Sequence, residues 1–204
     1  MGLREKFKVV IIVGVPGVGK TTVTKLMLEK ARNEGINIKI VNFGDYMFKA
    51  AKNMKLISHR DELRKLPLRT QCKLQLEAAK RIVEDSEKLD KDSFLIIDTH
   101  SLIHTVSGYW SGLPLHVIEI LKPDMIAVIE ASPEDIVKRR MRDREIRMRW
   151  DERTLDEIKF FMELARNSAL TAGMFVGAAV PIIINKEGRQ EEAAIELLSK
   201  MKSL

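Results

Sequence analysis

Gly14-Val15-Pro16-Gly17-Val18-Gly19-Lys20-Thr21 matches the pattern GxxxxGK(S/T), which is typical of phosphate-binding loops. In such a loop the glycines let backbone N–H groups point at phosphates. The lysine reaches the β- and γ-phosphates, and the threonine hydroxyl is offered to Mg²⁺. The helix after the loop adds its positive N-terminal end to the same anion site. The stretch therefore predicts a nucleoside triphosphate site, with Lys20 as its catalytic cation and Thr21 as a metal ligand.

The sequence on either side of the loop supports this interpretation. Residues 9–13 read Val-Val-Ile-Ile-Val, a continuous apolar run typical of a buried parallel strand. Residues 22–34 have helical character and end before Gly35, a residue type that often terminates helices. The alternative is a glycine-rich turn that binds no nucleotide, and the strand, loop and helix context disfavours it.

Strand-like and helix-like segments alternate along the rest of the chain, which predicts a parallel sheet covered by helices on both faces. The further strands are expected at 37–43, 94–97, 125–129 and 180–184. Helices are expected at 46–53, 59–66, 67–87 and 154–175 and from about residue 190, with a loop around Gly108 and Gly112. We therefore predict a three-layer α/β fold around a five-stranded parallel sheet.

Length and composition limit the class of protein. The 204 residues suit one well-buried domain, so residues 1–204 are expected to form a single unit. Cys72 is the only cysteine, which excludes an intramolecular disulfide and a cysteine metal cluster and fits a reducing cytosol. No apolar run is long enough to span a bilayer. We therefore expect a cytoplasmic protein without membrane contact.

Asp98 follows the apolar run at 94–97, at the C-terminal end of a predicted strand. Ligands of open parallel sheets collect at this edge. P-loop proteins place there an acidic residue that holds Mg²⁺ directly or through water. An aspartate that caps the following turn is the alternative. We assign Asp98, together with Thr21, to the metal side of the phosphate site.

Two segments predict a site for a second, phosphorylated substrate within about residues 42–75. Asn42 and Gly44 lie at the C-terminal end of the second predicted strand. Arg60 and Arg64 are four residues apart in a predicted helix, a spacing that puts both guanidinium groups on one face. The alternative for the arginines is an exposed helix with local ion pairs. A phosphate acceptor would decide between the two interpretations.

The segment from Lys138 to Arg149 carries seven basic side chains in twelve residues, six of them arginine. Arginine suits planar, bidentate contacts to phosphate. Beside a phosphate loop, this favours an arginine-rich lid at about 138–152 over a merely solvated helix face. Binding of nucleic acid is the competing use of such a patch. We expect no nucleic acid, because the aromatic residues that would stack on bases are missing apart from Trp150.

Several motifs together resemble those of the archaeal-type adenylate kinases. They are the phosphate loop, Val-Asn-Phe-Gly-Asp-Tyr-Met-Phe at 41–48, Arg-Asp-Glu-Leu-Arg-Lys-Leu at 60–66, Asp98-Thr99-His100, and Ser107-Gly108-Tyr109 with Gly112-Leu113-Pro114. The similarity runs from about Lys8 to the C-terminal helix. The resemblance implies a P-loop kinase fold with strand order 2-3-1-4-5 and a homotrimer.

The same resemblance implies reversible transfer of the γ-phosphoryl group of MgATP to AMP, which gives two ADP. The residues implied to hold the ATP phosphates are Gly17, Gly19, Lys20, Thr21 and Thr22. The resemblance places Arg60 and Arg64 in the AMP region, to which we also assign Asn42 and Gly44. It places Arg139, Arg147 and Arg149 in the lid, and we expect these three to be catalytic together with Lys20. Where the family commonly has a basic residue followed by Thr-Pro, this chain has His104-Thr105-Val106, so His104 becomes a candidate AMP contact.

Three rival functions follow from the same residues. The first is a kinase of another nucleoside monophosphate, and the second is an ATP-dependent nucleic-acid-binding protein. The third is a GTP switch, but Asn185-Lys186-Glu187-Gly188 lacks the final carboxylate of the guanine-reading NKxD motif. A monophosphate acceptor needs no catalytic base, because its second pKa of about 6 leaves it mostly ionised at neutral pH.

Overall fold

The computed structural model describes residues 7–105, 107–143 and 154–204. Its central sheet contains five parallel strands, β1 (Lys8–Val13), β2 (Ile38–Asn42), β3 (Phe94–Asp98), β6 (Met125–Glu130) and β7 (Ile182–Ile184). They lie in the order β2-β3-β1-β6-β7. Counted along the chain among the strands of this sheet alone, the order is 2-3-1-4-5, as the family resemblance implied.

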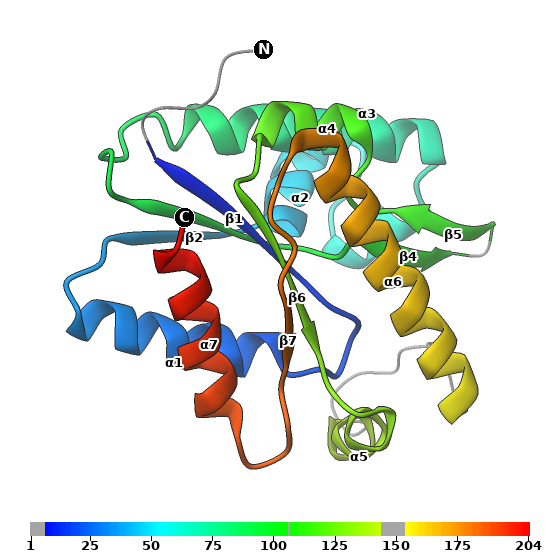
Figure 1. Cartoon of the computed structure of the whole chain (residues 1–204). Coiled ribbons are helices and arrows are strands. Elements are labelled where there is room, and N and C mark those ends of the chain that lie inside the picture. Colours follow the sequence, from blue (N-terminus) through cyan, green and yellow to red (C-terminus); the bar gives the residue numbers. More distant parts are fainter. Residues whose placement is uncertain (1–6, 106, 144–153) are drawn as a thin grey trace.

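Helices cover both faces of the sheet (Figure 1). They are α1 (Lys20–Asn33), α2 (Phe43–Asn53), α3 (Leu68–Glu84), α4 (Leu115–Leu121), α5 (Pro133–Asp143), α6 (Leu155–Val176) and α7 (Gln190–Lys202). Figure 1 shows α1 and α7 on one side of the sheet and α3 and α4 on the other. The predicted three-layer α/β architecture is confirmed.

The two layers of core follow from the alternation of side chains along β1. Val10 and Ile12 are fully buried in the core under α1, α6 and α7. Val9 and Ile11 are fully buried in the opposite core, under α3 and α4. Because successive side chains of a strand point to opposite faces, a strand covered on both sides must be apolar throughout. This explains why the run at 9–13 has no polar residue.

The segment expected to be a loop around Gly108 is a β-hairpin, so that prediction was wrong. Strands β4 (Leu102–Thr105) and β5 (Gly108–Ser111) pair antiparallel outside the main sheet. Glycine and proline nearby obscured the strand propensity of Ile103, Tyr109 and Trp110. The hairpin also accounts for the gap in numbering between β3 and β6 in the main sheet.

Three element boundaries differ from the sequence expectation. Helix α2 begins at Phe43, directly after β2, because the Asn42 side chain accepts a hydrogen bond from the Asp45 N–H and caps the helix. The segment 59–66 forms a 3₁₀-helix, η1 (Arg60–Lys65), rather than an α-helix. The last strand is shorter than expected, since Ala179 makes only an isolated bridge to Met125 before β7 begins.

The run of small residues in α6 packs inside the domain. Ala165, Ala169, Ala172 and Gly173 are all buried. A Cβ on Gly173 would lie 2.3 Å from the Val180 side chain, so the chain leaving α6 crosses the helix closely. Among the described helices, none is long and apolar enough to cross a membrane.

Candidate functional site

The phosphate loop connects β1 to α1 at the C-terminal edge of the sheet. Gly17 and Gly19 have φ angles of +94° and +86°, a left-handed conformation that favours glycine. A Cβ on Gly19 would lie 2.4 Å from the Asn185 side-chain nitrogen, so space also requires glycine there. Gly19 is the N-cap of α1, and no side chain caps the helix. The N–H groups at the start of α1 are therefore available to an anion.

Lys20 meets Asp98 at the centre of this edge. The Lys20 Nζ lies 3.0 Å from Asp98 Oδ1 and donates a 2.6 Å hydrogen bond to the Thr99 carbonyl. The other Asp98 oxygen accepts a 3.0 Å hydrogen bond from Asn42 Nδ2. Burial lowers the pKa of Lys20, although the Asp98 charge opposes that shift. Thus β3 and β2 place Asp98 and Asn42 beside the loop lysine.

The residues predicted for the metal fit Mg²⁺ held mainly by a nucleotide. Thr21 is exposed in the first turn of α1, and the Asp98 side chain is 31 % exposed. Within the described residues, no group of three or more His, Cys, Asp or Glu side chains could hold a metal by itself. One hydroxyl and one carboxylate are what Mg²⁺ commonly takes from a protein when phosphates and waters complete its shell.

A cleft that is open to solvent extends from Lys20. It is lined by Lys20, Asn42, Phe43, Gly44, Met47, Arg60, Gln75, Asp98, Thr99, His100, Ile103 and Gly112. The lining thus joins the end of the phosphate loop to three of the residues predicted for AMP, which are Asn42, Gly44 and Arg60. Its remaining members include apolar side chains from α2 and β4.

Arg60 is held in this cleft by side chains at the start of α2. Its guanidinium group forms an ion pair with Asp45 and donates a 3.0 Å hydrogen bond to Asn42 Oδ1. A Cβ on Gly44 would lie 2.7 Å from Arg60 Nη2, so glycine leaves room for the arginine. The position of the Arg60 guanidinium group therefore depends on Gly44 and Asn42 as well as on the charge of Asp45.

Arg60 and Arg64 do not share one helical face, contrary to the prediction. Both lie in η1, where three residues make a turn, so residues four apart are rotated by about 120°. Arg64 is nevertheless close enough to His100 for its charge to contribute to lowering the pKa of that histidine. Arg60 thus lines the cleft, whereas Arg64 is exposed and is not among the residues that line it.

His100 lies beside the phosphate loop. Its Nδ1 is 3.2 Å from the Gly14 carbonyl oxygen, which can only accept, so Nδ1 is the protonated nitrogen. Burial first, and then the Lys20 charge, lowers the pKa of His100 to about 4. His100 is therefore neutral at physiological pH and joins β3 to the start of the phosphate loop.

His104 does not line the cleft, in contrast to what its sequence position indicated. It is exposed on β4, and its ring lies 4.8 Å from the Tyr109 ring and 6.4 Å from the Phe161 ring. Its neighbour Ile103 lines the cleft instead. Alternate residues of a strand face opposite ways, which explains why the two residues differ.

Two arginines of α5 bind the phosphate loop itself. Arg139 donates hydrogen bonds to the Val18 carbonyl (2.9 Å) and to Glu187, with which it forms a 2.9 Å ion pair. Arg140 donates twice to the Pro16 carbonyl, at 2.9 and 3.0 Å. The sequence analysis singled out Arg139 but not Arg140. The predicted lid residues Arg147 and Arg149 lie outside the described residues.

The segment after β7 completes the loop's surroundings, and sequence reasoning did not assign it to the site. Asn185 is buried, and its Nδ2 donates a 2.7 Å hydrogen bond to the Val18 carbonyl. Glu187 holds Arg139. The resemblance of residues 185–188 to NKxD was the available signal. Because NKxD is a motif that reads guanine, the resemblance did not by itself predict a contact of Asn185 with the phosphate loop.

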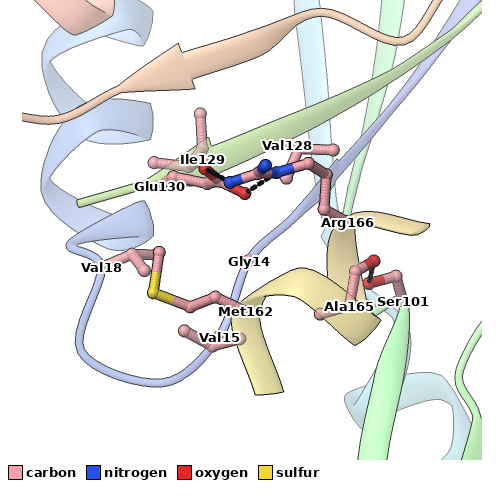
Figure 2. A pocket seen from close by; sticks show the side chains of 10 residues that line it. All are labelled: Gly14, Val15, Val18, Ser101, Val128, Ile129, Glu130, Met162, Ala165 and Arg166. Carbon is pink, nitrogen blue, oxygen red and sulfur yellow. Dashed lines mark hydrogen bonds and ion pairs between the residues drawn. The ribbon is translucent and has the colours of Figure 1, made fainter. Parts of the chain in front are cut away.

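An ion pair between a buried carboxylate and a partly exposed arginine also lies near the loop. Figure 2 shows Arg166 of α6 reaching Glu130 at the end of β6, close to Gly14 and Val18. Two hydrogen bonds of 2.7 Å join the guanidinium and carboxylate groups. Glu130 is 5 % exposed and needs this partner, since an unpaired buried carboxylate is costly. The pair ties α6 to the same sheet edge and raises the pKa of Arg166.

The arrangement suits transfer of a phosphoryl group. Anion-binding N–H groups and the Lys20 ammonium group meet a carboxylate that can hold Mg²⁺, and a cleft with a further arginine opens beside them. Catalysis of phosphoryl transfer is mainly positioning and stabilisation of charge, which these groups can supply.

Comparison with known proteins is consistent with this chemistry. Residues 13–159 match the family model described as an AAA domain. The chain is 44 % identical to an adenylate kinase of Pyrococcus horikoshii, over 96 % of this chain and 95 % of the relative. It is 44 % identical to that of Methanocaldococcus jannaschii (97 % and 100 %) and 42 % identical to that of Saccharolobus solfataricus (95 % and 99 %).

A solved structure with the same fold is the shikimate kinase from Acinetobacter baumannii in complex with shikimate. It aligns with a TM-score of 0.55 over 98 % of this chain and 95 % of that one, at 14 % identity. At this level of identity the match concerns the fold alone.

Proposed function

The chain belongs to the adenylate kinase family, and from that premise we propose how its residues carry out the reaction. As a nucleoside monophosphate kinase it transfers a phosphoryl group reversibly from ATP to AMP, giving two ADP. The observation that carries the assignment of sites is that Lys20 of the phosphate loop shares one cleft with Asn42, Gly44 and Arg60.

On the donor side, residues 14–22 hold the ATP phosphates. The Lys20 ammonium group leaves Asp98 for the β- and γ-phosphates of bound ATP, which together carry more negative charge than one carboxylate. Thr21 and Asp98 would hold Mg²⁺, which would neutralise phosphate charge when it is bound. Arg139 lies at the base of the lid. Arg147 and Arg149 remain the lid arginines predicted to cover the transferred group.

On the acceptor side, Arg60 and Arg64 bind the AMP phosphate. Arg60 is supported by Asp45 and Asn42, which keep its guanidinium group in the cleft before AMP binds. The AMP phosphate is mostly ionised at neutral pH, with a second pKa of about 6, so it attacks without a protein base. The enzyme's contribution is to hold donor and acceptor phosphates in line and to exclude water.

Two further properties belong to this proposal. Exposed apolar side chains on α6, among them Phe160, Met174 and Phe175, support the homotrimer that the resemblance implied. A cytoplasmic location is supported by the single cysteine, Cys72, which is not in a disulfide.

The test is ADP formation from MgATP with AMP, CMP, UMP and GMP offered separately. We expect the highest kcat/KM with AMP. A higher value with another monophosphate would assign the chain to that kinase reaction. Absence of ADP formation with every acceptor would overturn the proposal.

A further inference from the structure

Gln75 of α3 presents an unused acceptor atom beside the cleft. The side chain is 1 % exposed, and its Nε2 donates a 3.2 Å hydrogen bond to the Ser111 carbonyl at the end of β5. A backbone carbonyl can only accept, so the amide nitrogen must face Ser111 and the orientation of the amide is determined. In the described part of the chain, Oε1 is buried and has no hydrogen-bond partner.

The surroundings of Gln75 fit an aromatic base rather than a phosphate. The cleft that Gln75 lines also has apolar walls from Phe43 and Met47 of α2 and from Ile103 of β4. Its charged lining residues are Lys20, Arg60 and Asp98, which suit the phosphate end of a nucleotide. A ligand pocket of this kind is mostly apolar, with a few polar atoms that set orientation and specificity.

We propose that Gln75 is the residue that reads the base of the acceptor nucleotide. Its Oε1 accepts a hydrogen bond from the 6-amino group of adenine, so the cleft prefers a 6-amino purine to a 6-oxo purine. This inference rests on the proposed function, because it needs the cleft to be the acceptor site. Gln75 does not touch the reacting atoms and is therefore a specificity residue.

The selectivity follows from the hydrogen-bonding capacity of the two groups. A 6-amino group donates to Oε1 and satisfies the buried oxygen. A 6-oxo purine places a second acceptor opposite Oε1, so the two oxygens repel each other, and its N1–H can reach Oε1 only if the base shifts in the cleft. The amide cannot rotate to offer its NH₂ group without losing Ser111 and placing two oxygens together. The preference is thus built into β5 as well as into Gln75.

The test combines a variant that lacks the Gln75 amide with an acceptor nucleotide that lacks the 6-amino group. The acceptors are AMP and purine riboside 5′-monophosphate, which lacks the 6-amino group, with MgATP saturating. In the wild-type enzyme we expect the KM of the analogue to be about tenfold higher than that of AMP. In Gln75→Met, which has similar length but no amide, the KM values should differ by less than about twofold. The kcat for AMP should change by less than about threefold.

Gln71→Met is the matched control. Gln71 lies one turn earlier on α3 and is also buried, but its Nε2 donates to the Leu66 carbonyl and it is not among the residues that line the cleft. Its KM ratio should equal that of the wild type, even if the variant is less stable. In the wild type, IMP, whose base is a 6-oxo purine, should be a poorer acceptor than purine riboside 5′-monophosphate. In Gln75→Met this difference should disappear.

The outcomes separate this inference from the proposed function. A wild-type enzyme that forms no ADP from AMP would overturn the proposed function. An active wild type whose preference for AMP over the analogue survives in Gln75→Met would overturn the role of Gln75 alone. If Gln71→Met and Gln75→Met lose the preference for AMP over the analogue equally, the effect comes from the packing of α3. That result would also overturn the role of Gln75.

Discussion

At the scale of single residues, the site is a small network around Lys20. The ammonium group is buried and depends on Asp98 and on the Thr99 carbonyl. Asn42 has two roles, because its Nδ2 binds Asp98 while its Oδ1 accepts from Arg60 and caps α2. One asparagine thus connects the Lys20–Asp98 ion pair to Arg60. Sequence reasoning identified each of these residues but not their connection.

Lys20→Ala should reduce kcat by at least about 10²–10³-fold while the protein stays folded. The phosphate charge would lose its main protein cation. Stability should change little, because burial already disfavours the charged lysine and Asp98 keeps the hydrogen bond from Asn42. The check is a steady-state assay together with a thermal melt followed by circular dichroism. An unchanged kcat in a folded variant would contradict the role of Lys20.

His100 should make stability depend on pH between about 4 and 6.5. The pKa of His100 is lowered to about 4 in the folded protein. Between these values the unfolded chain binds a proton that the folded protein does not. The free energy of unfolding therefore falls as pH drops from 6.5, by up to about 3 kcal/mol once pH 4 is reached. Urea unfolding at pH 7.5 and 5.0 measures this change.

The experiment is repeated with two variants, one that lacks His100 and a control that lacks an exposed histidine. His100→Asn should show a smaller loss of stability between pH 7.5 and 5.0 than the wild type. His59→Asn, at an exposed position, should lose as much as the wild type does. Identical pH dependence in all three proteins would rule out His100 as the group responsible.

At the scale of elements, short segments between the main strands and helices place the site residues. Helix α5 brings Arg139 and Arg140 onto the phosphate loop, and η1 places Arg60 in the lining of the cleft. The β4–β5 hairpin supplies Ile103 and the Ser111 carbonyl. Of these elements, η1 and the β4–β5 hairpin were predicted least well from the sequence. They are short, so their type depends on tertiary packing more than on intrinsic propensity.

Thr154→Ala should lower the free energy of unfolding by about 1 kcal/mol. Thr154 caps α6 by accepting from the Glu157 N–H, while the Glu157 side chain accepts from the Thr154 N–H. Thr171→Ala, at an exposed interior position of the same helix, should have no such cost, because alanine is the better helix former. Chemical denaturation of both variants checks the difference. Equal effects would mean that the capping box contributes nothing.

At the scale of the whole molecule, the parallel sheet gathers the site at one edge. The strand ends at Val13, Asn42, Asp98 and Glu130 lie side by side because β1, β2, β3 and β6 are neighbours in register. Crossover helices on both faces make this possible and leave the edge open for ligands. Segments far apart in the chain, such as Val18 and Asn185, meet there.

Met174→Glu should break the proposed homotrimer into monomers. Met174 on α6 is 84 % exposed, and Phe160 and Phe175 on the same helix are exposed as well. A charge in an apolar interface costs several kcal/mol when it has no partner, enough to shift assembly. Sedimentation equilibrium measures the mass of the particle. Lys200→Glu, a change at an exposed site on α7, should leave that mass unchanged. A monomeric wild type would overturn the proposal directly.

Much of the fold could be predicted from local patterns. The phosphate loop, the apolar strand at 9–13 and the acid after 94–97 each depend on residues close together in the chain, and each was located correctly. The contact of Asn185 with Val18 could not be predicted in this way, because the two residues are 167 positions apart. The face that His104 presents depends on the register of a hairpin that local composition obscured.

The sequence by itself determined which chemical groups are available: a phosphate-loop motif with its lysine, a carboxylate at a strand end and the arginines proposed for a second phosphate, in a three-layer α/β chain. Tertiary structure alone decided which of these groups share a cleft. It brought Asn42, Asp98 and Lys20 together, turned His104 to the outer face and oriented the Gln75 amide by means of Ser111. The physical reason is that residue type carries charge and hydrogen-bonding capacity, whereas direction and partners depend on packing between distant segments.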